Sequence, residues 1–241
     1  VAILIWGCVF CAIAALCIFL SSNYDREKRR YLILMESFAS LLLLMDAMAH
    51  IFSGYPGVPG SVMVCISSFL VFLLSDVFLL CFHIYVCVYL FSKKERRTLK
   101  RVKAGYVIAA AGAAFVVISQ FTHWYYYIDG DNCYHRAPLY IMSILLPAAG
   151  LLIDLTLLLQ YKKRVSRKLL FSMLSCVVLP AVAAAVQAFW YGMSLIEFSV
   201  GISMIIMFIV TMTELNQEMY QLISREGKIK ERLEIATILN K

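Results

Sequence analysis

The sequence predicts an all-α membrane protein: a seven-transmembrane helix bundle with a short extracellular β-hairpin between the fourth and fifth helices and a cytoplasmic helix at the C-terminus. Of its 241 residues, 62% are hydrophobic and only 15% are charged, whereas soluble domains carry roughly 25% charged residues. Seven apolar stretches each have about the 20 residues that cross a bilayer as a helix. Lys and Arg are concentrated in alternate connections between these stretches.

The first three spans are residues 1–20, 31–53 and 61–91. The first span is longer than the roughly 7–15-residue core of a signal peptide, so we expect it to remain in the membrane. Gly and Pro residues in 54–60 end the second span, because both residue types stop helices and favour turns. The third span is long enough to tilt or to project beyond the lipid.

The last four spans are residues 104–121, 137–161, 169–190 and 194–213. The first of these four is rich in Ala and Gly, and small residues allow helices to approach closely. We therefore expect this helix inside the bundle. Pro180, in the middle of its span, predicts a kink at that point.

The distribution of basic residues predicts the orientation in the plasma membrane. The loops that follow the first, third and fifth spans hold 16 of the 22 Lys and Arg residues, and the loops on the other side hold Arg136 alone. Basic loops usually face the cytoplasm. The N-terminus is therefore expected outside the cell and the C-terminus in the cytoplasm. The net charge of +7 belongs to these loops, so nucleic acid is not an expected partner.

Residues 214–241 are typical of a helix that leaves the membrane and pairs with a second copy. Spacings of three and four, with one gap of seven, separate the apolar positions Met212, Leu215, Met219, Leu222, Ile229, Leu233 and Ala236. Such a heptad seam predicts a coiled coil, weakened where Glu226 stands next to Gly227. The alternative is a helix that lies on the inner leaflet.

These boundaries divide the chain into two parts. We expect residues 1–213 to form a seven-transmembrane domain, a candidate sensor domain, and residues 214–241 to form a linker helix. The chain begins at Val1 rather than Met and stops at Lys241 within a helical pattern. We therefore expect it to be part of a longer protein in which an output domain follows.

Residues 123–136 form a polar, aromatic connection in which strand-forming residues flank an Asp-Gly dipeptide. This pattern is typical of a β-hairpin turn, although an aromatic belt at the membrane surface with an ordinary loop remains an alternative. Asp129 and Asp131 lack the spacing and the terminal Glu of a calcium loop, so turn formation explains them better and no metal is expected. A disulfide between Cys65 and Cys133 is a further hypothesis.

Ionisable residues inside spans are costly in lipid and are functional candidates. Asp46 and His50 lie four residues apart, so one helix face carries both. They are candidates for binding a ligand or a proton, or for a hydrogen-bonded pair that packs the bundle. Asp76, His83 and Asp154 are candidates for an intramembrane polar relay, or for groups that only hold helices together.

The candidate ligand site is an outer cavity with apolar walls and a few convergent polar groups, as in most small-molecule pockets. Its predicted members come from the second, sixth and seventh spans and from the hairpin. They are Asp46, His50, Tyr126, Asp129, Asn132, Tyr134, Arg136, Gln187, Trp190, Tyr191 and Glu197. For Trp190, an interfacial aromatic belt is an equal alternative.

The sequence gives little support for an enzyme or for a bound cofactor. No Lys lies within a span to form a retinal Schiff base, and the HExxH, GxSxG and P-loop motifs are absent. The CxxC spacing of Cys8 and Cys11 lies in an apolar span without a second pair, so we interpret it as packing.

The pattern resembles the seven-transmembrane input domains of Firmicute signalling proteins. The resemblance rests on the seven spans, the helical exit and matching positions at Tyr126, Tyr127, Ile128, Asp129, Asn132, Tyr134, Arg136, Pro180, Gln187, Tyr191 and Gly192. It implies a sensor whose output is a GGDEF diguanylate cyclase or a histidine kinase domain. It implies no catalytic residue, and the matching positions inherit a structural or ligand-contact role.

Two functions follow as hypotheses. The first is a membrane receptor that binds a small molecule or peptide from outside or from the bilayer, and that relays a helix movement to a cytoplasmic output, as a homodimer. The alternative is a small-solute or proton-coupled transporter. An odd number of spans and the lack of an internal repeat argue against the transporter.

Overall fold

The structure is a computed structural model that describes residues 1–21, 25–189 and 194–239. Within these ranges, seven helices are long and apolar enough to cross a membrane. They are α1 (Ala2–Leu20), α2 (Arg26–Phe52), α3 (Val58–Leu90), α5 (Lys100–Thr122), α6 (Met142–Gln160), α7 (Arg167–Phe189) and α8 (Leu195–Leu239). By helix length and composition, the chain is a multi-pass membrane protein, as the sequence predicts.

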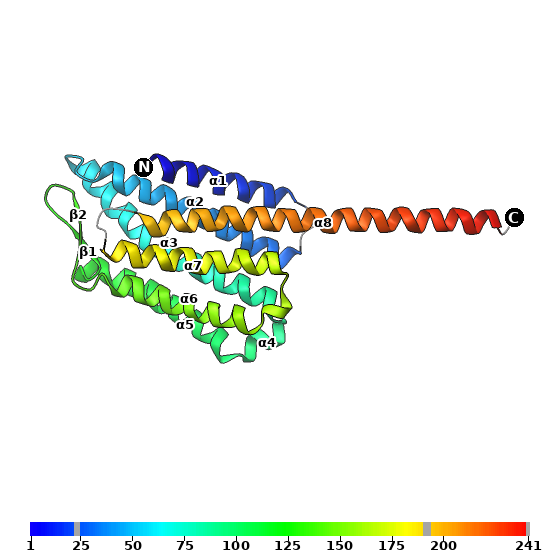
Figure 1. Ribbon diagram of the computed structural model, residues 1–241. Helices are drawn as coiled ribbons and strands as arrows, with labels where there is room; N and C mark the ends of the chain where they lie inside the picture. The colour runs from blue at the N-terminus through cyan, green and yellow to red at the C-terminus, as the bar shows by residue number, and fades with distance from the viewer. Residues whose placement is uncertain (22–24, 190–193, 240–241) are drawn as a thin grey trace.

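The long helices run side by side and give the bundle two ends (Figure 1). The hairpin end carries the turn between α2 and α3 and the strands β1 (Tyr126–Ile128) and β2 (Tyr134–Arg136). The basic end carries the short helix α4 (Lys93–Thr98) and the 3₁₀ turn η1 (Lys162–Arg164). Helix α8 crosses the bundle and extends far beyond the basic end (Figure 1).

The core of the bundle lies around α2, which contacts α1, α3 and α8. Met35 and Leu42 of α2 are buried together with Phe82 of α3 and Met204 of α8. Large apolar side chains such as Trp6 remain exposed at the surface of the protein. In a bilayer such residues can contact lipid, so close packing and hydrogen bonds between helices must hold the bundle together.

Helix α2 begins at Arg26, five residues before the predicted start of the second span. The reason is the side chain of Asp25, which accepts hydrogen bonds from the backbone N–H groups of Glu27 at 3.0 Å and Lys28 at 3.1 Å. This N-cap satisfies donors that a helix start otherwise leaves unpaired. Part of the first basic loop is therefore helical.

The predicted loop at 92–103 also contains helix, because α4 forms within it and α5 begins at Lys100. Ser92 and Glu95 form a reciprocal capping box at the start of α4, with the Ser92 N–H donating to Glu95 Oε2 at 2.8 Å. The hydrogen bonds from Ser92 and from Arg164 of η1 lower the pKa of Glu95. These contacts connect the basic loop after the third predicted span with the basic loop after the fifth.

Helix α5 lies at the side of the bundle rather than inside it, contrary to the expectation from its small residues. Its buried face contains Val102, Gly105, Ala109 and Gly112, at alternating spacings of three and four, and the helix packs on α3 and α6. Its other face is exposed, and Val107 is 67% accessible. The small residues do permit close contact, but along one face only.

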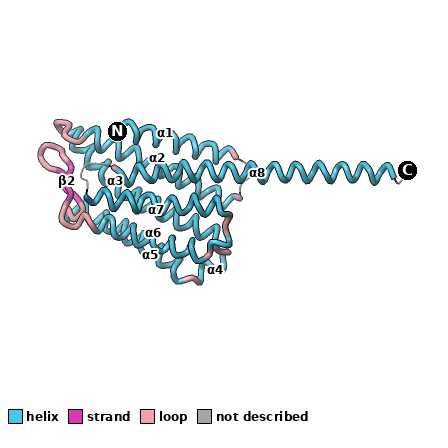
Figure 2. Tube along the Cα trace, in the orientation of Figure 1, coloured by secondary structure: helices cyan, strands magenta, loops and turns pink. Residues whose placement is uncertain are grey.

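The predicted hairpin is present, with β1 and β2 paired antiparallel and Tyr127 opposite His135 (Figure 2). The Asp129-Gly130 dipeptide lies in the turn, and the connection between the strands is five residues long, 129–133. The residue in the left-handed region is Asn132, at φ 61°, and Asn tolerates this conformation. Cys133 in this connection is a free thiol, as is Cys65, so the hypothetical disulfide between them is not formed.

Helix α6 begins at Met142, five residues after the predicted start of its span. The preceding residues fold back on the hairpin, where the N–H of Ala137 donates to Tyr125 O at 3.0 Å and the N–H of Leu139 donates to Trp124 O at 3.2 Å. These bonds hold the segment in turns, so it is unavailable to the helix.

Helix α8 is one continuous helix of 45 residues, or about 68 Å at the usual rise per residue. No break separates the predicted membrane span from the predicted linker within Leu195–Leu239. Along the heptad seam Leu215 is buried, whereas Leu222 and Ile229 are 59% and 58% exposed. The seam positions Leu233 and Ala236 lie outside the side chains that the structure describes.

Candidate functional site

A polar cavity of about 250 Å³ lies at the hairpin end, between α2, α3, β2, α7 and α8. The polar side chains that line it are Asp46, His50, Ser53, Ser68, Tyr134, Arg136, Tyr140, Gln187, Ser194 and Glu197. Six of these, Asp46, His50, Tyr134, Arg136, Gln187 and Glu197, belong to the predicted ligand site. The fold therefore brings together residues up to 151 positions apart in sequence, which is the separation of Asp46 from Glu197.

Asp46 and His50 lie one turn apart on α2 and face the same cavity, as their spacing predicts. His50 Nε2 lies 2.7 Å from Ser194 Oγ and 3.7 Å from Asp46 Oδ1. The same ring nitrogen therefore faces both partners. A Ser-His-Asp triad needs them on opposite nitrogens, so this arrangement differs from such a triad.

Gln187 joins three elements at the cavity. Its backbone oxygen accepts hydrogen bonds from both terminal nitrogens of Arg136 at 3.3 Å. Its side-chain Oε1 accepts the N–H of Ile196 at 2.9 Å, one of the first N–H groups of α8, which have no partner within the helix. The guanidinium of Arg136 also lies 4.4 Å from the centre of the Tyr140 ring. The hairpin, α7 and the start of α8 are thus linked.

Two carboxylate oxygens at this cavity have no hydrogen-bond partner among the described residues, namely Asp46 Oδ2 and Glu197 Oε2. Their residues are only 7% and 8% exposed. An unpaired buried polar group costs about 1–3 kcal/mol, and more when charged. Both residues line the cavity, but these two oxygens are shielded from it, so a donor reaches them only when the side chains turn.

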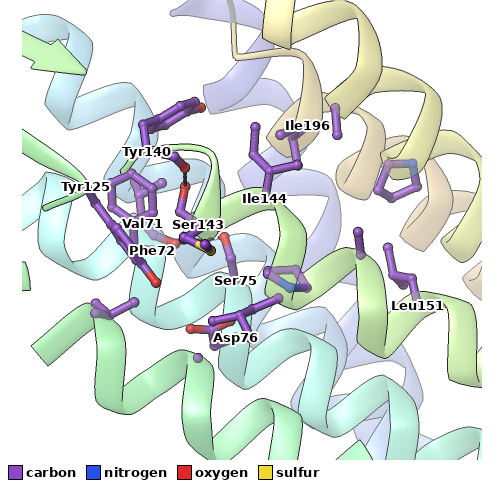
Figure 3. Close-up of a pocket in the computed structure, with 18 of the residues that line it drawn as sticks. Val71, Phe72, Ser75, Asp76, Tyr125, Tyr140, Ser143, Ile144, Leu151 and Ile196 are labelled. Atoms are coloured by element: carbon purple, nitrogen blue, oxygen red, sulfur yellow. Dashed lines mark hydrogen bonds between the residues drawn. The ribbon is translucent and has the colours of Figure 1, made fainter. Parts of the chain in front are cut away.

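Figure 3 shows a second, apolar cavity, of about 330 Å³. It adjoins the polar one. The two share Val71, Phe72, Tyr140 and Glu197 in their linings. Most of the remaining wall is apolar and comes from α3, α5, α6, α7 and the start of α8, with the predicted kink residue Pro180 among it. The two cavities adjoin at the shared residues, and we call the pair the recess, with one polar and one apolar end.

Three predicted site residues of the hairpin do not line the polar cavity but hold the hairpin in place. Tyr126 stacks on Phe72 of α3 at 5.4 Å between ring centres, and its hydroxyl donates to Gln120 at 3.0 Å. Asn132 Nδ2 donates to the carbonyl of Tyr55 at 2.8 Å, in the turn between α2 and α3. These contacts place Tyr134 and Arg136 at the cavity.

The third of these residues, Asp129, organises the turn itself. Its Oδ1 accepts the N–H groups of Cys133 at 2.8 Å and Asp131 at 3.0 Å, and its Oδ2 lies 2.7 Å from His135 Nε2. The hydrogen bond from the Cys133 backbone, followed by that from His135, lowers the pKa of Asp129. Its role here is structural.

The predicted relay residues occupy two separate places. Asp76 lines the apolar cavity and lies close to Gly112 of α5 (Figure 3). His83 lies two turns further along α3, with Nδ1 at 2.6 Å from Asp154 Oδ1 and Nε2 at 3.0 Å from Val102 O. Among the hydrogen bonds described, none joins Asp76 to this pair. The relay therefore stays a prediction.

The sequence did not indicate Ser68, Tyr140 or Ser194 as members of the site. Ser68 stands in an apolar run and Tyr140 at the start of an apolar span, where neither residue type is a signal of binding. Ser194 follows a short connection and is recognisable only once His50 is placed beside it. The predicted members Trp190 and Tyr191 lie outside the described residues.

Comparison of the chain with known protein families, with curated proteins and with solved structures finds no match. The resemblance to Firmicute input domains therefore remains a prediction from the sequence motif.

Proposed function

We propose that this chain is the sensor module of a membrane receptor. A ligand occupies the recess at the hairpin end and shifts α8, which carries the signal out of the membrane. The observation that supports this most is the continuity of α8. Glu197 in its first turn lines the recess, and the same helix continues to Leu239, beyond the basic end of the bundle.

Contacts at the point where α8 leaves the bundle support a relay role. Ser166, just before α7, hydrogen-bonds Glu214 of α8, and Lys168 donates to Gln217 at 3.3 Å. Both contacts are exposed and polar. Such surface contacts contribute little stability, so they can break when α8 shifts or rotates.

The energetic requirement is a difference in affinity between two arrangements of α8. A ligand that binds both arrangements equally shifts nothing, whatever its affinity. Coupling free energies between sites are typically about 1–3 kcal/mol, or roughly 5–150-fold in an equilibrium. One hydrogen bond from a ligand to the Glu197 carboxylate contributes a free energy of this size.

The proposed orientation places the N-terminus and the hairpin outside the cell and the end of α8 in the cytoplasm, by the distribution of basic residues. The proposed receptor is a homodimer, because the exposed Leu222 and Ile229 continue the heptad seam that a second copy would cover. The proposed output, by resemblance, is a diguanylate cyclase or histidine kinase domain after Lys241.

The test appends a reporter output domain after Lys241 and measures its basal activity in cells at matched expression. We expect Glu197→Gln to change the basal output by about fivefold or more, because it alters the balance between the two arrangements of α8. Asn216→Pro, which breaks the helix beyond the membrane, should remove the effect of Glu197→Gln. The matched control Asn216→Ala should preserve it.

Two outcomes would refute the receptor. One is an output that neither Glu197→Gln nor Asp46→Asn changes. The other is a Glu197→Gln effect that persists unchanged in the Asn216→Pro background, because the signal would then bypass α8.

A transporter is the second candidate, and the position of Asp76 on the wall of the apolar cavity favours it, since carboxylates at membrane depth often carry protons. Purified protein in liposomes that contain a pH-sensitive dye would then dissipate a proton gradient faster than empty liposomes. Asp76→Asn should abolish that flux. A flux equal to that of empty liposomes would exclude an uncoupled proton pathway through Asp76.

A further inference from the structure

The polar end of the recess has an excess of acidic groups. Asp46 and Glu197 both line it, and among the described residues of its lining Arg136 is the one permanently charged cation. The guanidinium of Arg136 is already used, because it donates to the Gln187 carbonyl and lies on the Tyr140 ring. The acidic groups therefore outnumber the cation that faces them.

Each of these two acids has one carboxylate oxygen without a hydrogen-bond partner among the described residues. Asp46 Oδ2 and Glu197 Oε2 are buried in side chains that line one cavity from two helices, α2 and α8, and neither has a hydrogen-bond partner among the described residues. A cationic group with N–H donors would pair with these oxygens and offset the cost of an ionised carboxylate in a buried site.

The other end of the recess fits a hydrocarbon chain. The apolar cavity shares Phe72 and Glu197 with the polar end, and Ala184 is part of its wall. The apolar side chains of Leu151 and Ile144 also line it (Figure 3). Its volume of about 330 Å³ is larger than that of the polar end. Transfer of a chain into such a wall is favourable by about 0.8 kcal/mol per methylene when the chain comes from water.

We infer that the ligand is a cationic amphiphile, with an ammonium head between Asp46 and Glu197 and an apolar chain in the adjoining cavity. This inference rests on the proposed function and names the ligand class of the same recess. An ammonium head that carries N–H groups satisfies both acceptors, whereas a quaternary head carries the charge without donors. An anionic head would face two carboxylates.

The test measures saturable binding to the full chain in phosphatidylcholine nanodiscs, with empty nanodiscs as the reference for partition into lipid. The probes are octylamine, octanol, octanoate, octyltrimethylammonium and ethylamine. Octylamine is expected to bind at least about tenfold more tightly than each of the others, a difference of about 1.4 kcal/mol. The comparison of octylamine with ethylamine tests the contribution of the hydrocarbon tail. The comparisons with octanol, octanoate and octyltrimethylammonium test the contribution of the head group.

Variants at each end of the recess identify the site. Glu197→Gln and Asp46→Asn should each weaken octylamine binding by about tenfold, which is about 1.4 kcal/mol. Ala184→Phe fills the apolar cavity and should weaken octylamine while leaving ethylamine unchanged. Its matched control is Ala110→Phe, at an exposed position of α5 that lines neither cavity. If Ala184→Phe does not fold, Ala184→Leu serves the same purpose.

The outcomes separate the ligand class from the function. Equal binding of octylamine and octanoate, or octylamine binding that Glu197→Gln leaves unchanged, would overturn the cationic head. Equal binding of octylamine and ethylamine would overturn the apolar chain. In each case the receptor would survive if Glu197→Gln still changed the basal output of the appended reporter. Saturable octylamine binding with no such change would instead refute the receptor.

Discussion

Gly105 on α5 lies against the ring of His83 on α3, and a side chain there has no room. A Cβ atom on Gly105 would lie 2.3 Å from His83 Nε2, which already contacts Val102 O. Gly105→Ala should therefore displace α5 from α3 and cost about 1–3 kcal/mol of stability, as overpacking usually does. A lower thermal unfolding midpoint in nanodiscs would show this.

Gly130 supplies the matched control for this prediction. A Cβ on Gly130, at the tip of the hairpin, has no heavy atom within 4 Å. Gly130→Ala should therefore leave the unfolding midpoint unchanged. Equal midpoints for Gly105→Ala and the original chain would show that the two helices are not in close contact.

Asp129 makes the hairpin sensitive to acid. Its pKa is lowered in the folded protein, mainly by the hydrogen bond from the Cys133 N–H. A lowered pKa contributes stability above the unfolded value of about 3.9, and this stability is lost as the pH falls through the folded pKa. Hydrogen exchange in the segment 126–136, corrected for the intrinsic rate, should therefore accelerate below pH 4.

Asp129→Asn is the control for this pH dependence, because an amide does not titrate. The variant should show faster exchange in 126–136 at neutral pH and no further loss of protection as the pH falls. Protection in the original chain that stays constant down to pH 2 would contradict the structural role of Asp129.

At the scale of single residues, the sequence predicted those members of the site that break the apolar pattern. Polar groups within spans cost free energy in lipid, so they stand out in an apolar sequence. Such groups are Asp46, His50, Gln187 and Glu197. Ser68 carries no comparable signal, because a serine in a helix can satisfy its hydroxyl on the preceding turn. Its place in the cavity depends on packing that a sequence does not state.

At the scale of elements, the exposed seam of α8 carries the dimer prediction. Leu222→Asn should lower the dimer fraction of the full chain in nanodiscs or detergent by about tenfold, because the seam is the proposed contact with a second copy. Single-molecule photobleaching of a fluorescently tagged chain counts the copies directly.

Ser224→Asn is the matched control, since Ser224 lies off the seam on the same helix. It should leave the dimer fraction unchanged. A monomer at all concentrations in the original chain, or a dimer that Leu222→Asn leaves intact, would exclude pairing through this part of α8.

The existence of the helices was predictable from hydropathy alone, but their ends were not. Capping by Asp25 and by Ser92 with Glu95 starts α2 and α4 inside segments that their charge marks as loops. Conversely, hydrogen bonds to the hairpin delay the start of α6 until Met142. Local hydrogen bonding decides these boundaries, and hydropathy does not report it.

At the scale of the whole molecule, the hairpin end could be anticipated as the place where distant polar groups meet. The apolar cavity could not. It forms where small side chains such as Ala181 and Ala184 of α7 face Pro147 of α6, so it depends on the relative placement of helices. The amphiphilic character of the recess is consequently a property of the assembled bundle.

The central claim is that the recess and the outer part of α8 are coupled. The direct measurement is the distance distribution between nitroxide labels at Arg97 of α4 and Tyr220 of α8, both exposed, introduced as non-canonical residues that leave the native cysteines in place. Glu197→Gln and Asp46→Asn should shift this distribution, and Gly130→Ala should not. An identical distribution in all four proteins would contradict the account.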